Sequence, residues 1–282
     1  MKKILLPTDF SDNSFKAITY ALKVYKDIKC TFYLLHTYNP SVYQTEYLIG
    51  SPGLIGLGDV MKETALTNSK ELKEKIELEY PNPKHTFKTR VIFNTLLNEV
   101  LEMTTSEGID LIVMGTKGAS GAEEILFGSN AVHIIKKTKC PLIVVPDSFA
   151  YEAPKEILFP TDFEITYPEK EIESLLQVVK HHKSQVNILY IRKAIALNMV
   201  QKEHKKQLDR LMVNHAIFHE VPDNEIITAI NDFQLKRKIN LLVMIQNKHT
   251  FFERLFIEPV LKRSVFMLLY PLWSFLNFKK LK

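Results

Sequence analysis

The sequence is poor in cysteine and in long uncharged runs. Its 282 residues include only two cysteines, Cys30 and Cys140, which excludes a disulfide-stapled secreted fold and any four-cysteine zinc site. A long uncharged run near the end of the chain, Ser264–Phe278, is interrupted by Pro271, and a spanning helix needs about 20 apolar residues. We therefore expect no membrane span. The first apolar run ends before Asp9, so we expect no secretory signal peptide either.

Glycine is absent from the second half of the chain. All nine glycines lie within residues 1–150, and residues 151–282 contain none. A loop that wraps phosphate with backbone N–H groups usually needs glycine, because glycine allows positive φ and close approach. Any phosphate chemistry is therefore expected in the first half.

The charge of the chain is only weakly basic. Residues 1–150 carry 17 basic and 17 acidic side chains, whereas residues 151–282 carry 20 and 15, so the net charge of +5 arises in the second half. Part of that excess is the terminal group of Lys279, Lys280 and Lys282. A solvated terminus explains this group, and we expect neither a nucleic-acid nor a membrane partner.

The chain repeats itself. Lys2–Phe10 reads KKILLPTDF and Lys155–Phe163 reads KEILFPTDF, with seven of nine positions identical. Farther along, DLIVM at 110–114 matches NLLVM at 240–244, and Pro141 matches Pro271 without a gap. A repeat this long indicates a duplicated domain, since solenoid units run to roughly 20–50 residues. We expect two domains, 1–148 and 153–282.

Short apolar segments alternate with helical patterns in both copies, which predicts parallel α/β sheets covered on both faces. The expected strands are Lys3–Leu6, Thr31–His36, Thr86–Phe93, Leu111–Met114, Leu142–Val145, Ile157–Phe159, Gln185–Tyr190, Ala216–Val221, Leu241–Ile245 and Leu272–Leu276. The expected helices are Phe15–Tyr25, Met61–Tyr80, Leu96–Ser106, Ser129–Lys139, Ile172–His181, Lys193–Val213, Asn224–Phe233 and Pro259–Leu269.

One glycine-rich loop follows a buried strand and ends at a predicted helix. Gly115 and Gly118 open the loop, and Gly128-Ser129-Asn130 closes it. A helix N-terminus offers N–H groups and the positive end of the helix dipole to phosphate. The loop lacks the Gly-Lys-Ser/Thr ending of a P-loop and the spacing of the dinucleotide fingerprint. An ordinary strand-to-helix loop with a capped helix remains the alternative.

The Gly-x2-Gly-x9-Gly-Ser pattern after an IVM strand resembles the ATP-binding signature of universal stress proteins. The opening KKILLPTDFSDNS, the LLH of the second strand and the ending IIKKTKCPLIVVP are similar to the same family. The resemblance covers 1–147 and, more weakly, 155–276, so the chain resembles a tandem universal stress protein. It implies two doubly wound domains, each with a five-stranded parallel sheet in the order 3-2-1-4-5. It also implies pairing of the two fifth strands in an intramolecular pseudo-dimer, and it leaves a homodimer open.

The resemblance also implies a site for ATP, with or without magnesium, at the switch point between strands one and four. Asp9 would face ribose or adenine, with Pro7 and Thr8 shaping that wall; Thr37 would read the adenine edge and Met114 would line the base pocket. The expected ribose and phosphate contacts are Gly115, Lys117, Gly118, Gly128, Ser129 and Asn130. Asp9 could equally be a turn or helix-capping residue, and Lys117 could equally be solvated.

Two departures from the family pattern bear on this site. Phe93-Asn94-Thr95 stands where the family usually has a glycine, and that bulk could crowd the pocket. The second copy has larger or charged residues at the loop positions: Ile245, Lys248, Glu258 and Pro259 align with Gly115, Gly118, Gly128 and Ser129 of the first copy. A carboxylate at a phosphate position repels the ligand, so we expect the second copy to be degenerate and to serve packing or partner contacts.

The favoured hypothesis is a cytoplasmic stress-response protein that binds ATP in its first domain. No dedicated catalytic group stands out besides Asp9, so we expect at most slow ATP hydrolysis. A non-nucleotide interaction scaffold is the alternative. An adenylating enzyme is less favoured, because neither an S-G-G-x-D-S loop nor an H-x-G-H motif occurs. His204, His215 and His219 could bind zinc, but no matching carboxylate constellation stands out, and we expect no zinc site.

Overall fold

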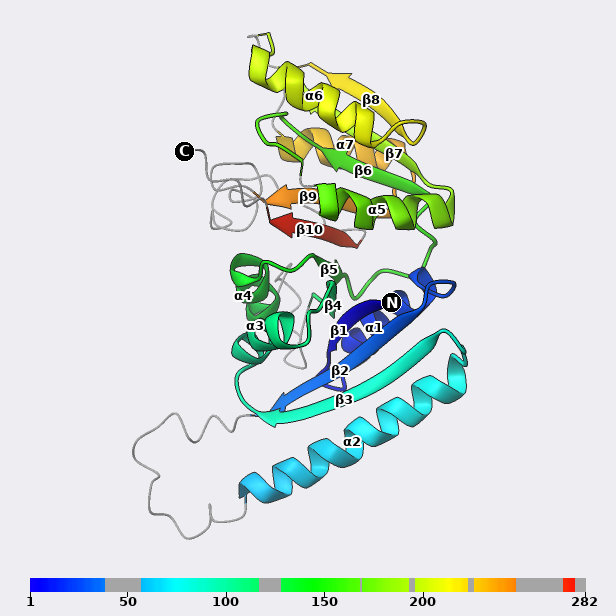
Figure 1. Cartoon of the computed structure of the whole chain (residues 1–282), viewed down its shortest axis with the longest axis vertical. Coiled ribbons are helices and arrows are strands. Elements are labelled where there is room, and N and C mark those ends of the chain that lie inside the picture. Colours follow the sequence, from blue (N-terminus) through cyan, green and yellow to red (C-terminus); the bar gives the residue numbers. More distant parts are fainter. Residues whose placement is uncertain are drawn as a thin grey trace, which may run out of the picture. The chain divides into compact units, whose positions relative to one another are not determined.

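A computed structural model describes residues 1–38, 57–116, 128–167, 169–192, 196–222, 226–246 and 271–276. They form two compact units, Met1–Cys140 and Pro141–Lys282. Each unit is an α/β structure in which parallel strands alternate with helices (Figure 1). Among the described residues, no helix is long and apolar enough to cross a membrane.

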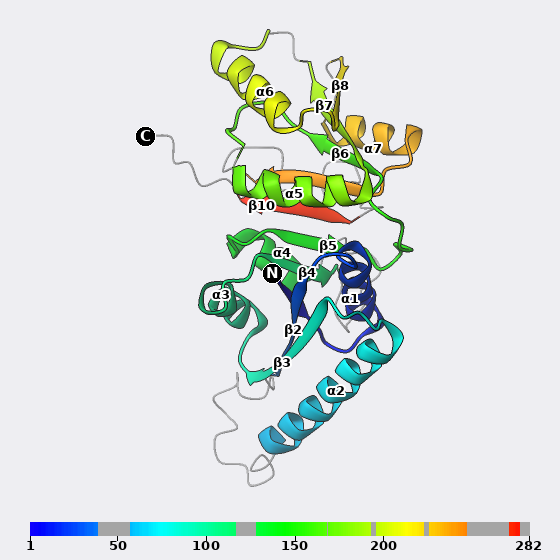
Figure 2. The same ribbon diagram turned by 45° about the vertical axis from the view of Figure 1, so that its right-hand side comes forward.

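The first unit is a parallel sheet with helices on both faces. Its strands follow the order β3-β2-β1-β4, and α1 and α2 lie on the face opposite α3 and α4 (Figure 2). The elements are β1 (Lys2–Pro7), α1 (Asp12–Val24), β2 (Cys30–Tyr38), α2 (Leu57–Glu79), β3 (His85–Phe93), α3 (Leu96–Ser106), β4 (Leu111–Gly115) and α4 (Ser129–Lys137).

Burial explains the order of these strands. Ile4, Leu5 and Leu6 of β1 are fully buried, and β4 is buried along its whole length, as expected for central strands covered on both faces. By contrast, most residues of β3 are exposed or half-buried, and Phe87 is its one buried residue, as expected at the edge of a sheet. Side chains at the helix N-caps set the starts of α1 and α3, where Ser11 accepts from the Ser14 N–H and Thr95 from the Asn98 N–H.

The second unit repeats this plan. Its parallel strands follow the order β8-β7-β6-β9-β10. The elements are β5 (Leu142–Val145), β6 (Glu156–Pro160), α5 (Glu169–His182), β7 (Gln185–Ile191), α6 (Met199–Leu211), β8 (Ala216–Val221), α7 (Ile226–Lys236), β9 (Leu241–Gln246) and β10 (Leu272–Leu276). Counted within the second copy, this order is 3-2-1-4-5, as predicted.

Strand β5 groups with the second unit although it belongs to the first copy in sequence. It pairs antiparallel with β10, with Ile143 opposite Trp273. Both side chains are buried, and Trp273 is the single tryptophan of the chain. The predicted pairing of the two fifth strands is therefore confirmed, and it covers apolar strand edges that would otherwise invite aggregation.

The helix predicted over Lys193–Val213 starts later than expected. In the structure α6 begins at Met199, behind an Asn198 cap whose side chain and that of Gln201 form a capping box. The cap fixes the start of the helix at this point. The helix predicted over Pro259–Leu269 lies outside the described residues.

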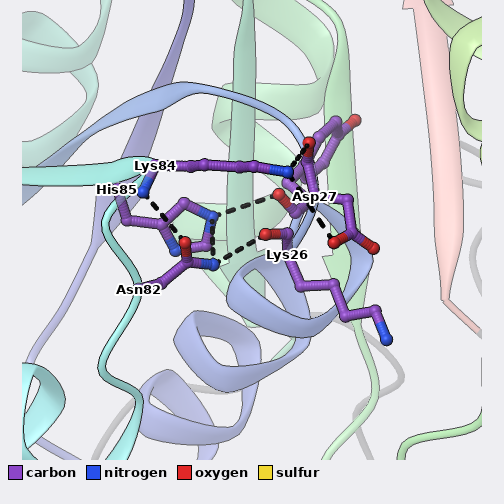
Figure 3. A network of polar contacts seen from close by, with 6 residues as sticks. Lys26, Asp27, Asn82, Lys84 and His85 are labelled. Atoms are coloured by element: carbon purple, nitrogen blue, oxygen red, sulfur yellow. Dashed lines mark hydrogen bonds and ion pairs between the residues drawn. The ribbon is translucent and has the colours of Figure 1, made fainter.

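A polar network closes the amino-terminal edge of the first sheet (Figure 3). The Asn82 amide donates to the Lys26 carbonyl over 2.7 Å, and the Lys84 ammonium donates to the Asp27 carbonyl over 3.0 Å. His85 Nε2 lies 3.1 Å from the Tyr25 carbonyl. These bonds satisfy carbonyls at the end of α1 and tie the start of β3 to that helix.

Candidate functional site

The site begins at the carboxyl end of β1, where the chain turns into α1. Pro7 is the last residue of β1, and the Thr8 N–H donates to the Leu35 carbonyl of β2 over 2.8 Å. The Thr8 hydroxyl accepts from the Phe10 N–H and lies 3.0 Å from the Ser14 hydroxyl of α1. Thr8 therefore ties the end of β1 to both the next strand and the next helix.

Phe10 holds a left-handed backbone conformation in this turn, with φ at 63°. Such a conformation costs roughly 1–2 kcal/mol for a residue with a side chain. The Phe10 ring lies 4.4 Å from the His36 ring, and His36 Nδ1 lies 2.9 Å from the Thr8 carbonyl oxygen. These contacts from β2 hold the turn in its strained form.

Asp9 takes part in the local turn. Its Oδ1 accepts from the Ser11 N–H over 3.1 Å and from the Ser11 hydroxyl over 2.5 Å. This is an Asx turn that leads into the helix. The turn role left open by the sequence is thus present in the geometry, and the expected contact of Asp9 with ribose or adenine stays a prediction.

Gly115 ends β4 against the start of α1. A Cβ at this position would lie 1.7 Å from Asn13 Oδ1 and 2.8 Å from Asn13 Cγ. The Asn13 side chain therefore occupies the space where a Cβ of residue 115 would lie. The sequence suggested a glycine for a tight loop, whereas the structure places Gly115 at the end of the strand, where its lack of a side chain makes room for Asn13. Met114 precedes it and is buried.

Gly128 is the N-cap of α4. Its N–H donates to the Thr116 carbonyl over 2.6 Å, which joins the start of α4 to the end of β4. Gly128 has no side chain to cap the helix, and Ser129 and Asn130 in the first turn are exposed. The N–H groups of this first turn can therefore meet an anion, and the helix dipole favours one.

Strand pairing brings most of the predicted site residues to one edge of the first sheet. β1 pairs with β4 through Ile4–Leu111 and Leu5–Ile112, and Pro7 pairs with Leu35 of β2. Because parallel strands end at the same edge, the following residues share it: Pro7, Thr8, Asp9, Thr37, Met114, Gly115, Gly128, Ser129 and Asn130. Lys117 and Gly118 lie outside the described residues.

Sequence reasoning missed two residues of this edge, Asn13 and His36. Asn13 meets Gly115, and His36 supports the turn after β1. His36 ends the LLH segment, and its place directly after the buried part of β2 was a usable signal. Nothing in the local pattern pointed to Asn13, because its contact is with a strand about 100 residues away.

Phe93 does not lie on the Thr37 side of the sheet. The centroid of its ring lies 5.6 Å from that of the Tyr38 ring, with an angle of 73° between the ring planes. Tyr38 and Thr37 point to opposite faces of the sheet, because side chains alternate along a strand. Tyr38 and Phe93 line an open hollow of about 520 Å³ together with Gly58, Asp59 and Lys62 at the start of α2. The bulk at the end of β3 therefore lies on the α2 face.

The second unit repeats the turn after its first strand. The Thr161 N–H donates to the Leu189 carbonyl over 2.9 Å, and the Thr161 hydroxyl accepts from the Phe163 N–H over 3.1 Å. Phe163 has φ at 58°, and Asp162 Oδ1 accepts from the Glu164 N–H. Each of these features has its counterpart at Thr8–Ser11, so the duplicated sequence folds into a duplicated turn.

Large side chains fill this turn in the second unit. Where Ser14 contacts Thr8, the Tyr167 hydroxyl lies 2.7 Å from the Thr161 hydroxyl, and Tyr167 is buried, which raises its pKa. Phe163 is fully buried and its ring lies 5.1 Å from that of Tyr190. Ile245 stands where the first copy has Gly115 and is also buried. Side chains thus occupy positions that are small or open in the first unit.

Three polar side chains of α6 bind the backbone of the same turn. Gln201 donates to the Asp162 carbonyl, and His204 Nδ1 lies 2.9 Å from the Phe163 carbonyl oxygen. The Gln207 amide exchanges two hydrogen bonds with the Tyr167 backbone, each 3.2 Å long. We call these three residues the α6 latch.

Two histidines of the second unit take structural roles. His204 belongs to the α6 latch, and His219 Nε2 lies 2.9 Å from the buried Asn187 Oδ1. Burial and the neighbouring Arg237 lower the pKa of His219. The described part of the chain contains no cluster of three histidine, cysteine or acidic residues that could hold a metal ion.

The first half of the chain matches a known protein family. The family model described as the universal stress protein family matches residues 1–146. A universal stress protein of Methanocaldococcus jannaschii is 35% identical over 144 residues, which cover 51% of this chain and 81% of that protein.

The whole chain is similar in fold to a solved structure. The crystal structure of a universal stress protein from Archaeoglobus fulgidus covers 98% of this chain and 96% of its own, with a TM-score of 0.67 and 18% identity. At that identity the likeness concerns the fold alone. A universal stress protein solved in complex with cAMP covers 51% of this chain at 17% identity and a TM-score of 0.37, too distant to carry over any site residue.

Proposed function

The chain belongs to the universal stress protein family, and from this premise we propose that its N-terminal unit binds ATP at the carboxyl ends of β1 and β4. The protein is then a cytoplasmic stress-response protein whose activity depends on nucleotide binding. Its C-terminal unit is a structural or partner-binding copy. ATP is a bound ligand in this proposal, and any hydrolysis is slow.

The observation that carries the proposal is the start of α4. Gly128 caps this helix without a side chain, and its N–H is held by the Thr116 carbonyl at the end of β4. The N–H groups of Ser129, Asn130 and Ala131 then take the phosphates, as expected for a helix N-terminus. Lys117 and Gly118 would complete the phosphate contacts, and magnesium, if bound, would supply further positive charge to the phosphates.

The nucleoside part lies toward β1 and β2 in this proposal. Asp9 meets the ribose, the Thr37 backbone reads the adenine edge, and Met114 lines the base pocket. Thr37 lies two residues beyond Leu35, the partner of Pro7 in the sheet. The base can therefore reach β2 while the phosphates reach α4, because both elements end at one edge of the sheet.

The second unit supports the asymmetry of the proposal. Its equivalent turn contains buried Phe163 and Tyr167 and is held by the α6 latch. Glu258 and Pro259 stand where Gly128 and Ser129 stand in the first copy. A carboxylate and a residue without an N–H both oppose phosphate binding, so one ATP per chain is proposed.

Equilibrium dialysis with ATP tests the proposal. Wild type should bind, and Gly128→Glu should not, because a carboxylate then occupies the phosphate position. Thr105→Glu, which adds the same charge on an exposed turn of α3, should bind like wild type. At a ligand concentration of 100 times Kd, binding stabilises the folded state by about 2.7 kcal/mol, so a thermal shift should accompany it. If wild type does not bind ATP at millimolar concentration, the proposal is wrong, and the alternative of an interaction scaffold without a nucleotide is favoured.

A further inference from the structure

A fully buried carboxylate lies beside the predicted adenine end of the site. Glu99, in the first turn of α3, has none of its side chain exposed. Its Oε1 accepts from Arg90 Nε of β3 over 3.0 Å, and its Oε2 accepts from Asn94 Nδ2 over 3.0 Å. The two oxygens of one side chain thus connect β3, the turn after it and α3.

Stability alone is a poor reason for this arrangement. Burying a carboxylate is costly unless it is paired and hydrogen-bonded, and Arg90 leaves 46% of its side chain exposed, so solvent weakens the attraction between the two charges. An apolar residue would often stabilise such a position as well or better. What the carboxylate supplies is a fixed position for Asn94.

Asn94 in turn fixes the start of α3. Its Oδ1 accepts from the Thr95 N–H over 2.8 Å, and the Thr95 hydroxyl accepts from the Asn98 N–H. Together, the side chains of Glu99, Asn94 and Thr95 take part in four hydrogen bonds that hold the turn between β3 and α3.

The turn lies directly beyond the residues expected to read the base. Thr37 pairs with Ile92, and Tyr38 pairs with Phe93, the last residue of β3. Arg90 pairs with Leu35, so strand alternation places Arg90, Ile92, Leu35 and Thr37 on one face, which is the face covered by α3. A displacement of the turn would therefore displace the wall next to Thr37.

We propose that Glu99 is a positioning residue that holds the β3–α3 turn as the outer wall of the purine pocket and so sets discrimination between bases. The inference rests on the proposed nucleotide site. Glu99 acts through Asn94 and does not itself touch the ligand. A loosened wall should admit other bases more readily while the phosphates keep their contacts at α4.

The test is the ratio of Kd for GTP to Kd for ATP, measured by equilibrium dialysis. Wild type should prefer ATP, and Glu99→Gln should reduce the ratio about tenfold, which corresponds to about 1.4 kcal/mol. Glu102→Gln, an exposed residue of the same helix, should keep the wild-type ratio. Asn94→Ala removes the same link at a partly exposed turn and should also reduce the ratio; it serves as the test if Glu99→Gln fails to fold.

Three other results would contradict the proposed role of Glu99. A purely structural role would weaken both nucleotides equally and leave the ratio unchanged, which would overturn the inference. A wild type that binds both nucleotides equally would overturn it too, while leaving nucleotide binding intact. A wild type that binds neither would overturn the proposed function and this inference with it.

Discussion

At the scale of single residues, two glycines of the first unit differ in why they must be glycine. Gly115 lies against the Asn13 side chain at the start of α1, where a Cβ has no space. Gly108 has φ at +63°, and a Cβ at that position would have no heavy atom within 4 Å. Gly115 is required because of side-chain packing, and Gly108 is required because of its backbone conformation. The two can be separated by substitution.

We expect Gly115→Ala to lower the free energy of unfolding by about 1–3 kcal/mol, the usual cost of overpacking. Adding Asn13→Ala should recover much of that loss, because the clash is with the Asn13 side chain. Gly108→Ala should also destabilise, but Asn13→Ala should not rescue it. Urea denaturation of wild type, the three single variants and the two double variants measures the coupling. Equal effects of Asn13→Ala on both glycine variants would contradict the packing explanation.

His85 gives the amino-terminal edge of the first sheet a dependence on pH. Burial lowers its pKa below the ordinary 6.5, and nearby Lys84 acts in the same direction. The unfolded chain therefore takes up the proton first as the pH falls. The stability that depends on neutral His85 is full above pH 6.5 and is lost as the pH falls below that value.

We expect acidification below pH 6.5 to destabilise wild type more steeply than His85→Gln. The measurement is the urea midpoint of both proteins between pH 5 and 8, with His133→Gln, an exposed histidine of α4, as the control. Parallel pH profiles for wild type and His85→Gln would show that the histidine in Figure 3 does not carry the effect.

The sequence singles out residues whose position in the fold follows from chain connectivity, although their ligand contacts stay predictions. Asp9 and Gly128 stand out because each lies where a strand passes into a helix. The Gly115–Asn13 contact and the Glu99 link to Arg90 and Asn94 were not predictable in this way. The first joins β4 to the distant helix α1, whereas Glu99 lies only nine residues from Arg90 and five from Asn94. Both contacts depend on which side chains of neighbouring elements meet in the fold, and hydrophobic periodicity does not encode that.

At the scale of elements, the hydrophobic pattern predicted strands and helices because burial on two faces leaves little choice of residue. β5 and β10 agree with the prediction to the residue. Helix starts were predicted less well, and α6 is the clearest case, because its start depends on the Asn198 side chain rather than on periodicity.

The α6 latch yields a prediction at this scale. We expect Gln207→Ala to lower the free energy of unfolding by about 1–2 kcal/mol, because two hydrogen bonds to the Tyr167 backbone are lost. Lys206→Ala, an exposed neighbour, should have little effect. Denaturation followed by the fluorescence of Trp273, which is buried in the second unit, measures both. A latch variant as stable as the control would show that these bonds do not hold the turn.

At the scale of the whole molecule, one sequence unit has been used twice with different outcomes. The turn after the first strand is conserved in geometry between the copies, down to the positive φ of Phe10 and Phe163. The second copy has replaced small residues with large ones and has lost every glycine. Duplication preserves the backbone, because the backbone is set by buried strands, while the site depends on a few small residues that can be lost separately.

The central claim is that this molecule has one nucleotide site, built in its first unit. Isothermal titration of the intact chain with ATP tests it most directly, because the stoichiometry counts sites without assuming where they are. We expect one ATP per chain for wild type and none for Gly128→Glu. Two ATP per chain, or one that survives Gly128→Glu, would contradict the account.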